Sequence, residues 1–109
     1  MKKTVIAIVT LAALTLSVVM ASAQTIKVGA ILAVTGGASF LGLPEERTLR
    51  MLVDEINAQG GIKGKKLELI VRDSGGSPER AVSFARQLIE EQRVFAIIGP
   101  STSGETMDQ

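Results

Sequence analysis

The stretch VTGGASFLGLPEE, residues 34–46, has a glycine spacing that could bind a phosphate group. Gly37 and Gly42 stand at the G-x-x-x-x-G spacing of loops that hold phosphates with their backbone N–H groups. Such a loop requires Lys and then Ser or Thr directly after its last Gly, whereas Leu43 and Pro44 follow Gly42 here. The G-x-G-x-x-G pattern of a dinucleotide-binding turn is missing as well. We therefore exclude a nucleotide site and interpret the stretch as another kind of binding loop or as a turn.

The stretch GPSTSGET, residues 99–106, carries three successive hydroxyl side chains at what reads as the start of a helix. The three residues are Ser101, Thr102 and Ser103. The start of a helix has unpaired backbone N–H groups at the positive end of the helix dipole, so it favours an anion. One hydroxyl alone would more simply cap the helix. Three of them facing a glycine-rich loop favour a ligand site.

Several residue types on which enzymes rely do not occur in the sequence. Its 109 residues include no Cys and no His, which excludes a disulfide framework, a thiol nucleophile and a His-ligated metal site. The Asp and Glu residues do not cluster as a hydrolytic or metal site would require, and no basic stripe or aromatic platform supports nucleic-acid binding. We therefore expect a protein that is not an enzyme, needs no cofactor or metal, and has no nucleic-acid partner.

The N-terminal stretch MKKTVIAIVTLAALTLSVVMASAQ predicts export. Two lysines precede an uncharged, mostly apolar run, and Ala21-Ser22-Ala23 supplies an A-x-A cleavage pattern. The run from Thr4 to Met20 is near the lower length limit for spanning a membrane, which favours a cleaved signal peptide over a retained anchor. We expect residues 1–23 to be the signal peptide and residues 24–109 to act in the periplasm as the truncated beginning of a longer protein.

Strands and helices alternate along the remaining sequence, which predicts an α/β fold with a parallel, doubly wound sheet. The helix that begins at Pro44 carries Leu49, Leu52, Val53 and Ile56 in one stripe, which we expect to be buried. The predicted strands cover residues 26–34, 66–73 and 94–99, and the predicted helices cover 44–59, 78–92 and a third one introduced by residues 101–103.

The two stretches with binding chemistry follow the first and third strands. If the strand order is 2-1-3, the topological switch point lies between these two strands, and ligands bind at such points outside the carboxyl ends of the strands. Residues 35–43 and 99–104 would then face one another. Asp73 ends the second strand like the ribose-binding acid of dinucleotide folds, but without the glycine pattern we interpret it as a turn residue. Phe40 and Leu41 either pack into the fold or form an apolar wall of the cleft.

Three ordered blocks resemble a known family. They are TIKVGAILAVTGGASFLG, LVDEINAQGGIKGKKLELIVRDSGGSPERAVSFARQLI and VFAIIGPSTSGET, and the most specific pieces are N-A-x-G-G-I-x-G-K-K-L and G-P-x-x-S-G-x-T. Over residues 25–107 the chain resembles the N-terminal part of a type I periplasmic binding protein of the branched-chain amino acid (leucine/isoleucine/valine) binding family. The resemblance implies a two-lobed protein that captures a small solute and delivers it to an ABC permease in the inner membrane. This chain would begin lobe I, with the flavodoxin-like order 2-1-3.

The resemblance also implies site residues. In that family a Ser of the loop after the third strand holds the ligand carboxylate, and by motif this Ser is Ser103. Pro100, Ser101 and Thr102 would line the approach, and the loop after the first strand would contact the ligand through Thr35, Phe40 and Leu41.

Some members have Tyr where this chain has Leu41, which leaves the solute open. We expect a small carboxylate, such as a branched-chain amino acid, with aromatic or other carboxylic acids as the alternative. A ligand-sensing module of a membrane receptor with the same fold is the other alternative.

Overall fold

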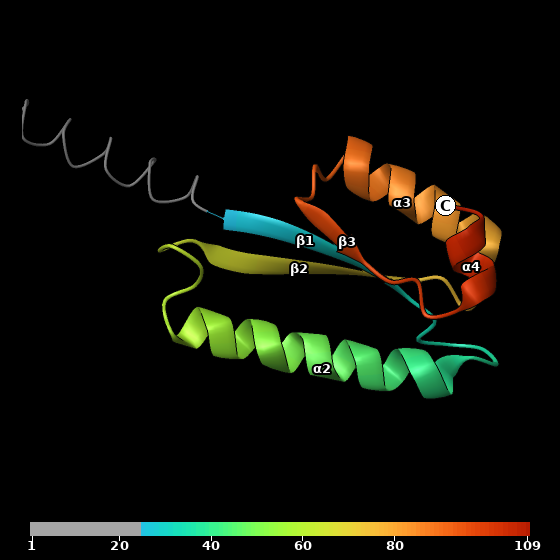
Figure 1. Cartoon of the computed structure of the whole chain (residues 1–109), viewed down its shortest axis with the longest axis horizontal. Helices are drawn as coiled ribbons and strands as arrows, with labels where there is room; N and C mark the ends of the chain where they lie inside the picture. Colours follow the sequence, from blue (N-terminus) through green and yellow to red (C-terminus); the bar gives the residue numbers. More distant parts are fainter. Residues whose placement is uncertain (1–24) are drawn as a thin grey trace, which may run out of the picture.

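The computed structural model describes residues 25–109, and the predicted signal peptide lies outside this range. Three parallel strands form one sheet in the order β2-β1-β3 (Figure 1). The predicted α/β class and the predicted 2-1-3 order are confirmed. The elements are β1 Thr25–Leu32, α2 Ser39–Ala58, β2 Lys66–Asp73, α3 Pro78–Glu90, β3 Ala96–Ile98 and α4 Ser103–Met107.

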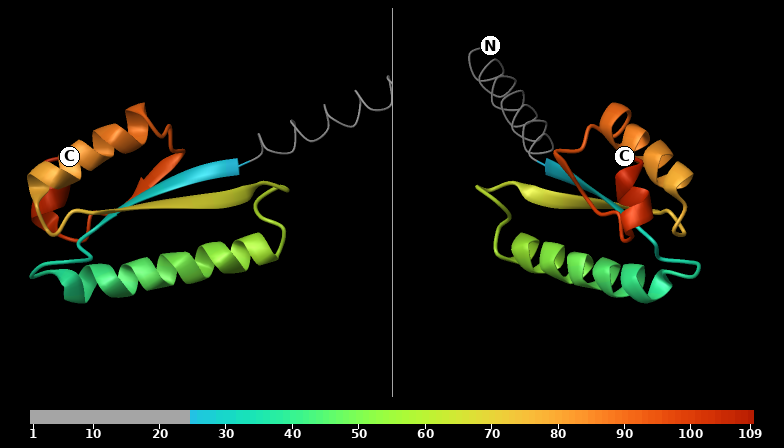
Figure 2. Two further views of the ribbon diagram at one scale, coloured as in Figure 1. Left: turned by 180° about the vertical axis from the view of Figure 1, so that it is seen from behind. Right: turned by 45° about the vertical axis from the view of Figure 1, so that its right-hand side comes forward.

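The central strand β1 carries most of the core. Its register with β2 runs from Thr25 opposite Lys66 to Leu32 opposite Asp73, and β3 pairs with it over three residues only. The side chains from Ala30 to Ala33 are buried, as expected for the middle strand of a parallel sheet with helices on both faces. Helix α2 covers one face of the sheet, while α3 and α4 lie on the other (Figure 2).

Strand β1 ends two residues before the predicted boundary because side chains take over its hydrogen bonds. The backbone N–H of Ala33 donates to Ser101 Oγ at 3.0 Å, and the N–H of Val34 donates to Asp73 Oδ1 at 2.9 Å. A residue bonded to a side chain in this way no longer joins the ladder of the neighbouring strand. The sheet therefore stops where the predicted binding loops begin.

Helix α3 begins at Pro78, as its sequence predicts, and ends at Glu90, two residues before the predicted end. Ser77 is the N-cap, its hydroxyl accepts the backbone N–H of Arg80 at 3.4 Å, and Pro78 is the first helical residue. Ala81 and Leu88 are buried against Ile31 of β1. This packing holds the N-terminal end of α3 beside the carboxyl ends of the strands.

Helix α2 begins at Ser39, so the prediction that Pro44 is its first residue is wrong. An additional turn precedes Pro44, since the N–H groups of Leu41 and Gly42 both donate to the carbonyl of Ala38. Gly42 allows this turn because a Cβ at that position would lie 2.1 Å from the carbonyl oxygen of Ala33. The glycine that resembled part of a phosphate loop is therefore explained by the close approach of α2 to the end of β1.

The predicted stripe on α2 is only partly buried. Leu49, Val53 and Ile56 are half-buried, but 43% of the surface of Leu52 is exposed, so its predicted burial is wrong. The reason is that α2 packs over β2 and β1. On that same face of the sheet, no other helix within residues 25–109 lies beside α2 to cover its exposed side.

The stretch NAQGGIKGKKL, residues 57–67, closes the opposite end of the fold. Asn57 forms two hydrogen bonds of 2.8 Å with the backbone of Leu67, one as donor and one as acceptor, and this fixes the start of β2 against α2. Gly60 and Gly61 have φ values of 101° and 79°, which end the helix in left-handed conformations. This stretch therefore stabilises the connection between α2 and β2, and it lies at the opposite end of the sheet from the loops with binding chemistry.

Candidate functional site

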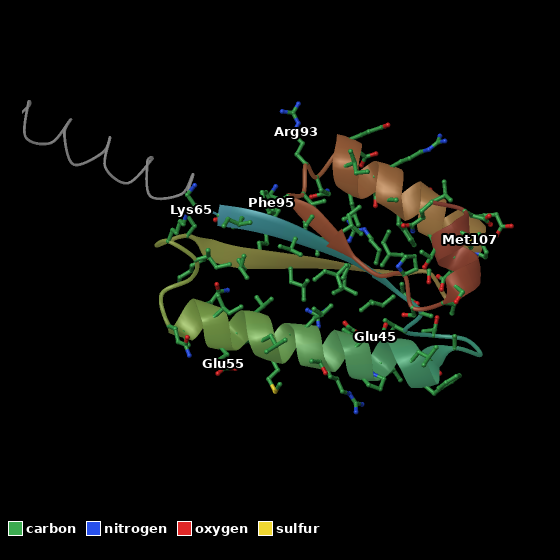
Figure 3. The ribbon with its side chains drawn as sticks, in the orientation of Figure 1. Glu45, Glu55, Lys65, Arg93, Phe95 and Met107 are labelled. Carbon is green, nitrogen blue, oxygen red and sulfur yellow. The ribbon has the colours of Figure 1, made fainter. Side chains whose placement is uncertain are left out.

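The loops that follow β1 and β3 meet at the carboxyl end of the sheet, and Ser101 joins them (Figure 1). The Ser101 hydroxyl accepts the N–H of Ala33 and donates its proton to Glu45 Oε2 at 2.6 Å. Glu45 projects from α2 toward the sheet to make this contact (Figure 3). Because a hydroxyl has one proton, Ser101 has none left to donate to a ligand in this arrangement.

Thr102 is the N-cap of α4 and forms a capping box with Glu105. Its hydroxyl donates to Glu105 Oε2 at 2.6 Å and accepts the backbone N–H of Glu105 at 3.4 Å. The Glu105 side chain is fully buried, and its other oxygen, Oε1, has no hydrogen-bond partner in the described part of the chain. Thr102 therefore fixes the start of α4, as a single capping hydroxyl would.

Ser103 is the first residue of α4, and it is exposed. Its hydroxyl makes no hydrogen bond to any other residue in the range 25–109. Of the three hydroxyls at this helix start, only that of Ser103 is free to donate to a bound carboxylate.

Asp73 joins the loops after β1 and β2. Its carboxylate accepts four hydrogen bonds, from Thr35 Oγ1 at 2.7 Å and from the N–H groups of Val34, Gly75 and Thr35 at 2.9, 2.9 and 3.2 Å. Burial acts to raise the pKa of Asp73, but the hydrogen bonds, led by that of the Thr35 hydroxyl, outweigh it and hold the net pKa below its ordinary value. The interpretation of Asp73 as a turn residue agrees with its bond to Gly75.

The apolar pair Phe40 and Leu41 lies in the first turn of α2, next to the loop after β1. Phe40 is 71% exposed and Leu41 is 37% exposed, so in the described part of the chain Phe40 does not pack into the fold. Pro100 is half-buried and lines a groove between α2 and β3, together with Leu32, Leu49 and Ile98. The predicted residues thus surround one end of the sheet, but three of their hydroxyls, on Thr35, Ser101 and Thr102, already donate to carboxylates.

The sequence interpretation missed two residues that shape this end of the sheet. Glu105 was detectable, because T-x-x-E is the pattern of a capping box. Glu45 was not, since its partner Ser101 is 56 residues away and no local pattern connects them.

Within residues 25–109, no group of three or more His, Cys, Asp or Glu side chains is placed to hold a metal ion. No helix in this range is both long and apolar enough to cross a membrane.

Sequence comparisons give consistent relatives. A family model described as periplasmic binding protein matches residues 25–108. Leu/Ile/Val-binding protein homolog 7 of Brucella abortus is 36% identical over 107 residues, which cover 98% of this chain and 26% of that protein. An amino acid binding protein of Pseudomonas aeruginosa is 32% identical over 73 residues, which cover 67% of this chain and 20% of that protein.

Solved structures share the fold of the described residues. One is the substrate-binding protein LivJ of a branched-chain amino acid transporter from Streptococcus pneumoniae, which was solved in complex with isoleucine. The match covers 78% of this chain and 24% of the LivJ chain, with a TM-score of 0.76 and 36% sequence identity. A type 1 periplasmic binding protein from Bordetella pertussis matches 77% of this chain and 23% of its own, with a TM-score of 0.71 and 36% identity. The chain thus spans about a quarter of the length of these relatives.

Proposed function

The chain belongs to the periplasmic binding protein family, and from that premise we propose that it begins lobe I of an extracytoplasmic solute-binding protein. The protein is exported by the signal peptide of residues 1–23 and captures a small carboxylate for an ABC importer. Its partners are the solute and a permease in the inner membrane. It is not an enzyme and needs no cofactor.

The observation that carries the proposal is the free hydroxyl of Ser103 beside loops whose other hydroxyls are engaged. Ser101 and Thr102 hold the loop after β3 in place, and Ser103 is left to donate to the ligand carboxylate. The N–H groups at the start of α4 that Thr102 does not cap add donors to the proposed site. A second lobe, supplied by the rest of a protein about four times this length, closes over the ligand, and binding shifts the population toward the closed state.

The solute class is inferred from Phe40 and Leu41, which lie in the first turn of α2 next to the loop after β1. Their exposed apolar surface suits the side chain of a branched-chain amino acid. The same surface suits an aromatic or other carboxylic acid, which is the alternative. A relative solved in complex with isoleucine supports the amino acid. The remaining alternative, a sensor module of a membrane receptor, differs in its partner and keeps the same ligand site.

The test is calorimetry on the complete protein as the organism makes it, titrated with isoleucine, leucine, valine and benzoate. Ser103→Ala should weaken carboxylate binding by about 1–3 kcal/mol, because a charged ligand loses one hydrogen bond. Ser83→Ala is the matched control, since Ser83 is exposed on α3 and makes no hydrogen bond through its side chain within residues 25–109. An unchanged dissociation constant for Ser103→Ala would remove Ser103 from the site.

A further inference from the structure

Glu45 on α2 connects that helix to the loop after β3, which leads into Ser103. Its carboxylate accepts the Ser101 hydroxyl at 2.6 Å, although the two residues are 56 positions apart in the sequence. Glu45 lines the same groove as Pro100, so the helix and the loop lie side by side there. The side chain points from α2 toward the sheet, whereas that of Glu55 on the same helix points away from it (Figure 3).

The Ser101 hydroxyl extends this connection to the end of β1. While it donates to Glu45, it accepts the N–H of Ala33 at 3.0 Å. The next N–H along the chain, that of Val34, donates to Asp73 at 2.9 Å. Two consecutive residues at the end of β1 are thus bonded on one side to the loop after β3 and on the other side to the end of β2. The hydrogen bonds from Glu45 to Asp73 link α2 with the ends of all three strands.

The start of α4 has no other hydrogen bond of this kind within residues 25–109. Thr102 makes its hydrogen bonds with Glu105 and Thr106, which both belong to α4 itself. These bonds shape the helix, and α4 also packs against α3, but they do not bond the helix start to the sheet or to α2. Ser101, two residues before Ser103, is therefore the residue that joins the start of α4 to other segments by hydrogen bonds.

Such a connection affects ligand binding because a hydrogen bond is sensitive to geometry. The bond from a hydroxyl to a ligand carboxylate weakens steeply outside a narrow range of distance and angle. A donor that is already in place before the ligand arrives also loses less conformational freedom on binding. The bond between Ser101 and the charged Glu45 carboxylate has the length of a strong, charge-assisted hydrogen bond, so it can hold the loop in this way.

We propose that Glu45 is a positioning residue of the solute site, which acts through Ser101 to place Ser103 for the ligand carboxylate without touching the ligand itself. This inference rests on the proposed carboxylate capture at Ser103 and adds the residue that keeps this donor in place. Because α2 also carries Phe40 and Leu41, the same bond fixes the apolar part of the proposed site relative to the carboxylate part.

The experiment is a double-mutant cycle measured by calorimetry on the complete protein, with the tightest binder among isoleucine, leucine, valine and benzoate. Glu45→Ala should weaken binding by about threefold to thirtyfold, and by less than Ser103→Ala does, because the Ser103 hydroxyl remains but is less well placed. In protein that already carries Ser103→Ala, Glu45→Ala should have no further effect, since the donor that it positions is gone. A residue that only stabilises the fold would not show this dependence.

Two further variants keep the test valid if Glu45→Ala does not fold, which circular dichroism of each variant would show. Glu45→Gln should bind more tightly than Glu45→Ala, because the amide oxygen still accepts the Ser101 hydroxyl. Ser101→Ala breaks the same bond from the other side. It should weaken binding at least as much as Glu45→Ala does, and it should have no further effect in protein that carries Ser103→Ala.

The control is Glu55→Ala, which removes the same kind of side chain from an exposed position of α2 that makes no side-chain hydrogen bond within residues 25–109. It should change the dissociation constant by less than about twofold, with or without Ser103→Ala. Equal binding by the wild type and by both Glu45→Ala and Ser101→Ala would overturn the inference. The same loss with and without Ser103→Ala would overturn it as well.

Ser103→Ala separates this inference from the proposed function. If Ser103→Ala weakens binding and the changes at Glu45 and Ser101 do not, the positioning role is refuted and the proposed function stands. If Ser103→Ala leaves every dissociation constant unchanged, the assignment of Ser103 fails and the positioning role fails with it. Failure of the wild type to bind any of the four solutes would refute both.

Discussion

Replacing Asp73 by Asn tests how the loops at the carboxyl end of the sheet are held. The change keeps the size of the side chain but removes the charge that four hydrogen bonds share. A hydrogen bond to a charged group contributes about 1.5–3 kcal/mol and a neutral one about 0.5–1.5 kcal/mol. Since the four bonds act on one carboxylate and are not additive, we expect Asp73→Asn to lower the free energy of unfolding by about 2–3 kcal/mol at pH 7.

The pH dependence of this loss has a defined sign. The pKa of Asp73 in the folded protein lies below its ordinary value of 3.8, so the unfolded chain takes up this proton at a higher pH than the folded one does. The stabilisation is therefore complete above the unfolded pKa, at about pH 5 and higher, and is lost as the pH falls through the folded pKa. The stability gap between wild type and Asp73→Asn should be constant from pH 7 to 5 and shrink below about pH 4.

Urea denaturation of the complete protein at pH 7, 5 and 3.5 measures this gap. Asp54→Asn is the matched control, because Asp54 is exposed on α2 and makes no hydrogen bond through its side chain within residues 25–109. It should change the free energy of unfolding by less than about 0.5 kcal/mol at pH 7. The reasoning fails if Asp73→Asn is as stable as the wild type at pH 7, or if the gap keeps its full size at pH 3.5.

Two further substitutions test the packing around the site by the same denaturation. Gly42→Ala should cost about 3 kcal/mol or more, because its methyl group would lie 2.1 Å from a backbone carbonyl oxygen of the segment after β1. Gly37→Ala, which meets no atom within 4 Å, should be near neutral, and equal effects of the two changes would contradict this account. Ser101→Ala should cost about 1–3 kcal/mol, because the carboxylate of Glu45 and a backbone N–H each lose a partner. Ser83→Ala on the exposed face of α3 is its control, and an equally stable Ser101→Ala would show that this bond does not hold the loop.

The elements that the sequence predicted well are those whose boundaries are set by local chemistry. Strand β2 has the predicted limits: polar and apolar residues alternate from Lys66 to Leu69, and the apolar run after them ends at Arg72 and Asp73. Helix α3 begins as predicted because Ser77 and Pro78 supply an N-cap and a first helical residue that need no distant partner. The order of strands and helices was enough to predict the parallel sheet.

The beginning of α2 and the roles of the loop hydroxyls depend on contacts between distant segments. The turn before Pro44 exists because Gly42 lets the helix touch the segment after β1, which no periodicity in the sequence signals. The burial predicted for Leu52 depends on a neighbour that the described residues do not supply.

The sequence alone determined the fold class, the family resemblance and the two loops that meet at the carboxyl end of the sheet, because strand and helix patterns and turn residues are local properties. It could not decide which hydroxyl of the Ser101, Thr102 and Ser103 group is free. That depends on where Glu45 and Glu105 place their carboxylates. A hydroxyl has a single proton, and only the tertiary structure decides which acceptor receives it.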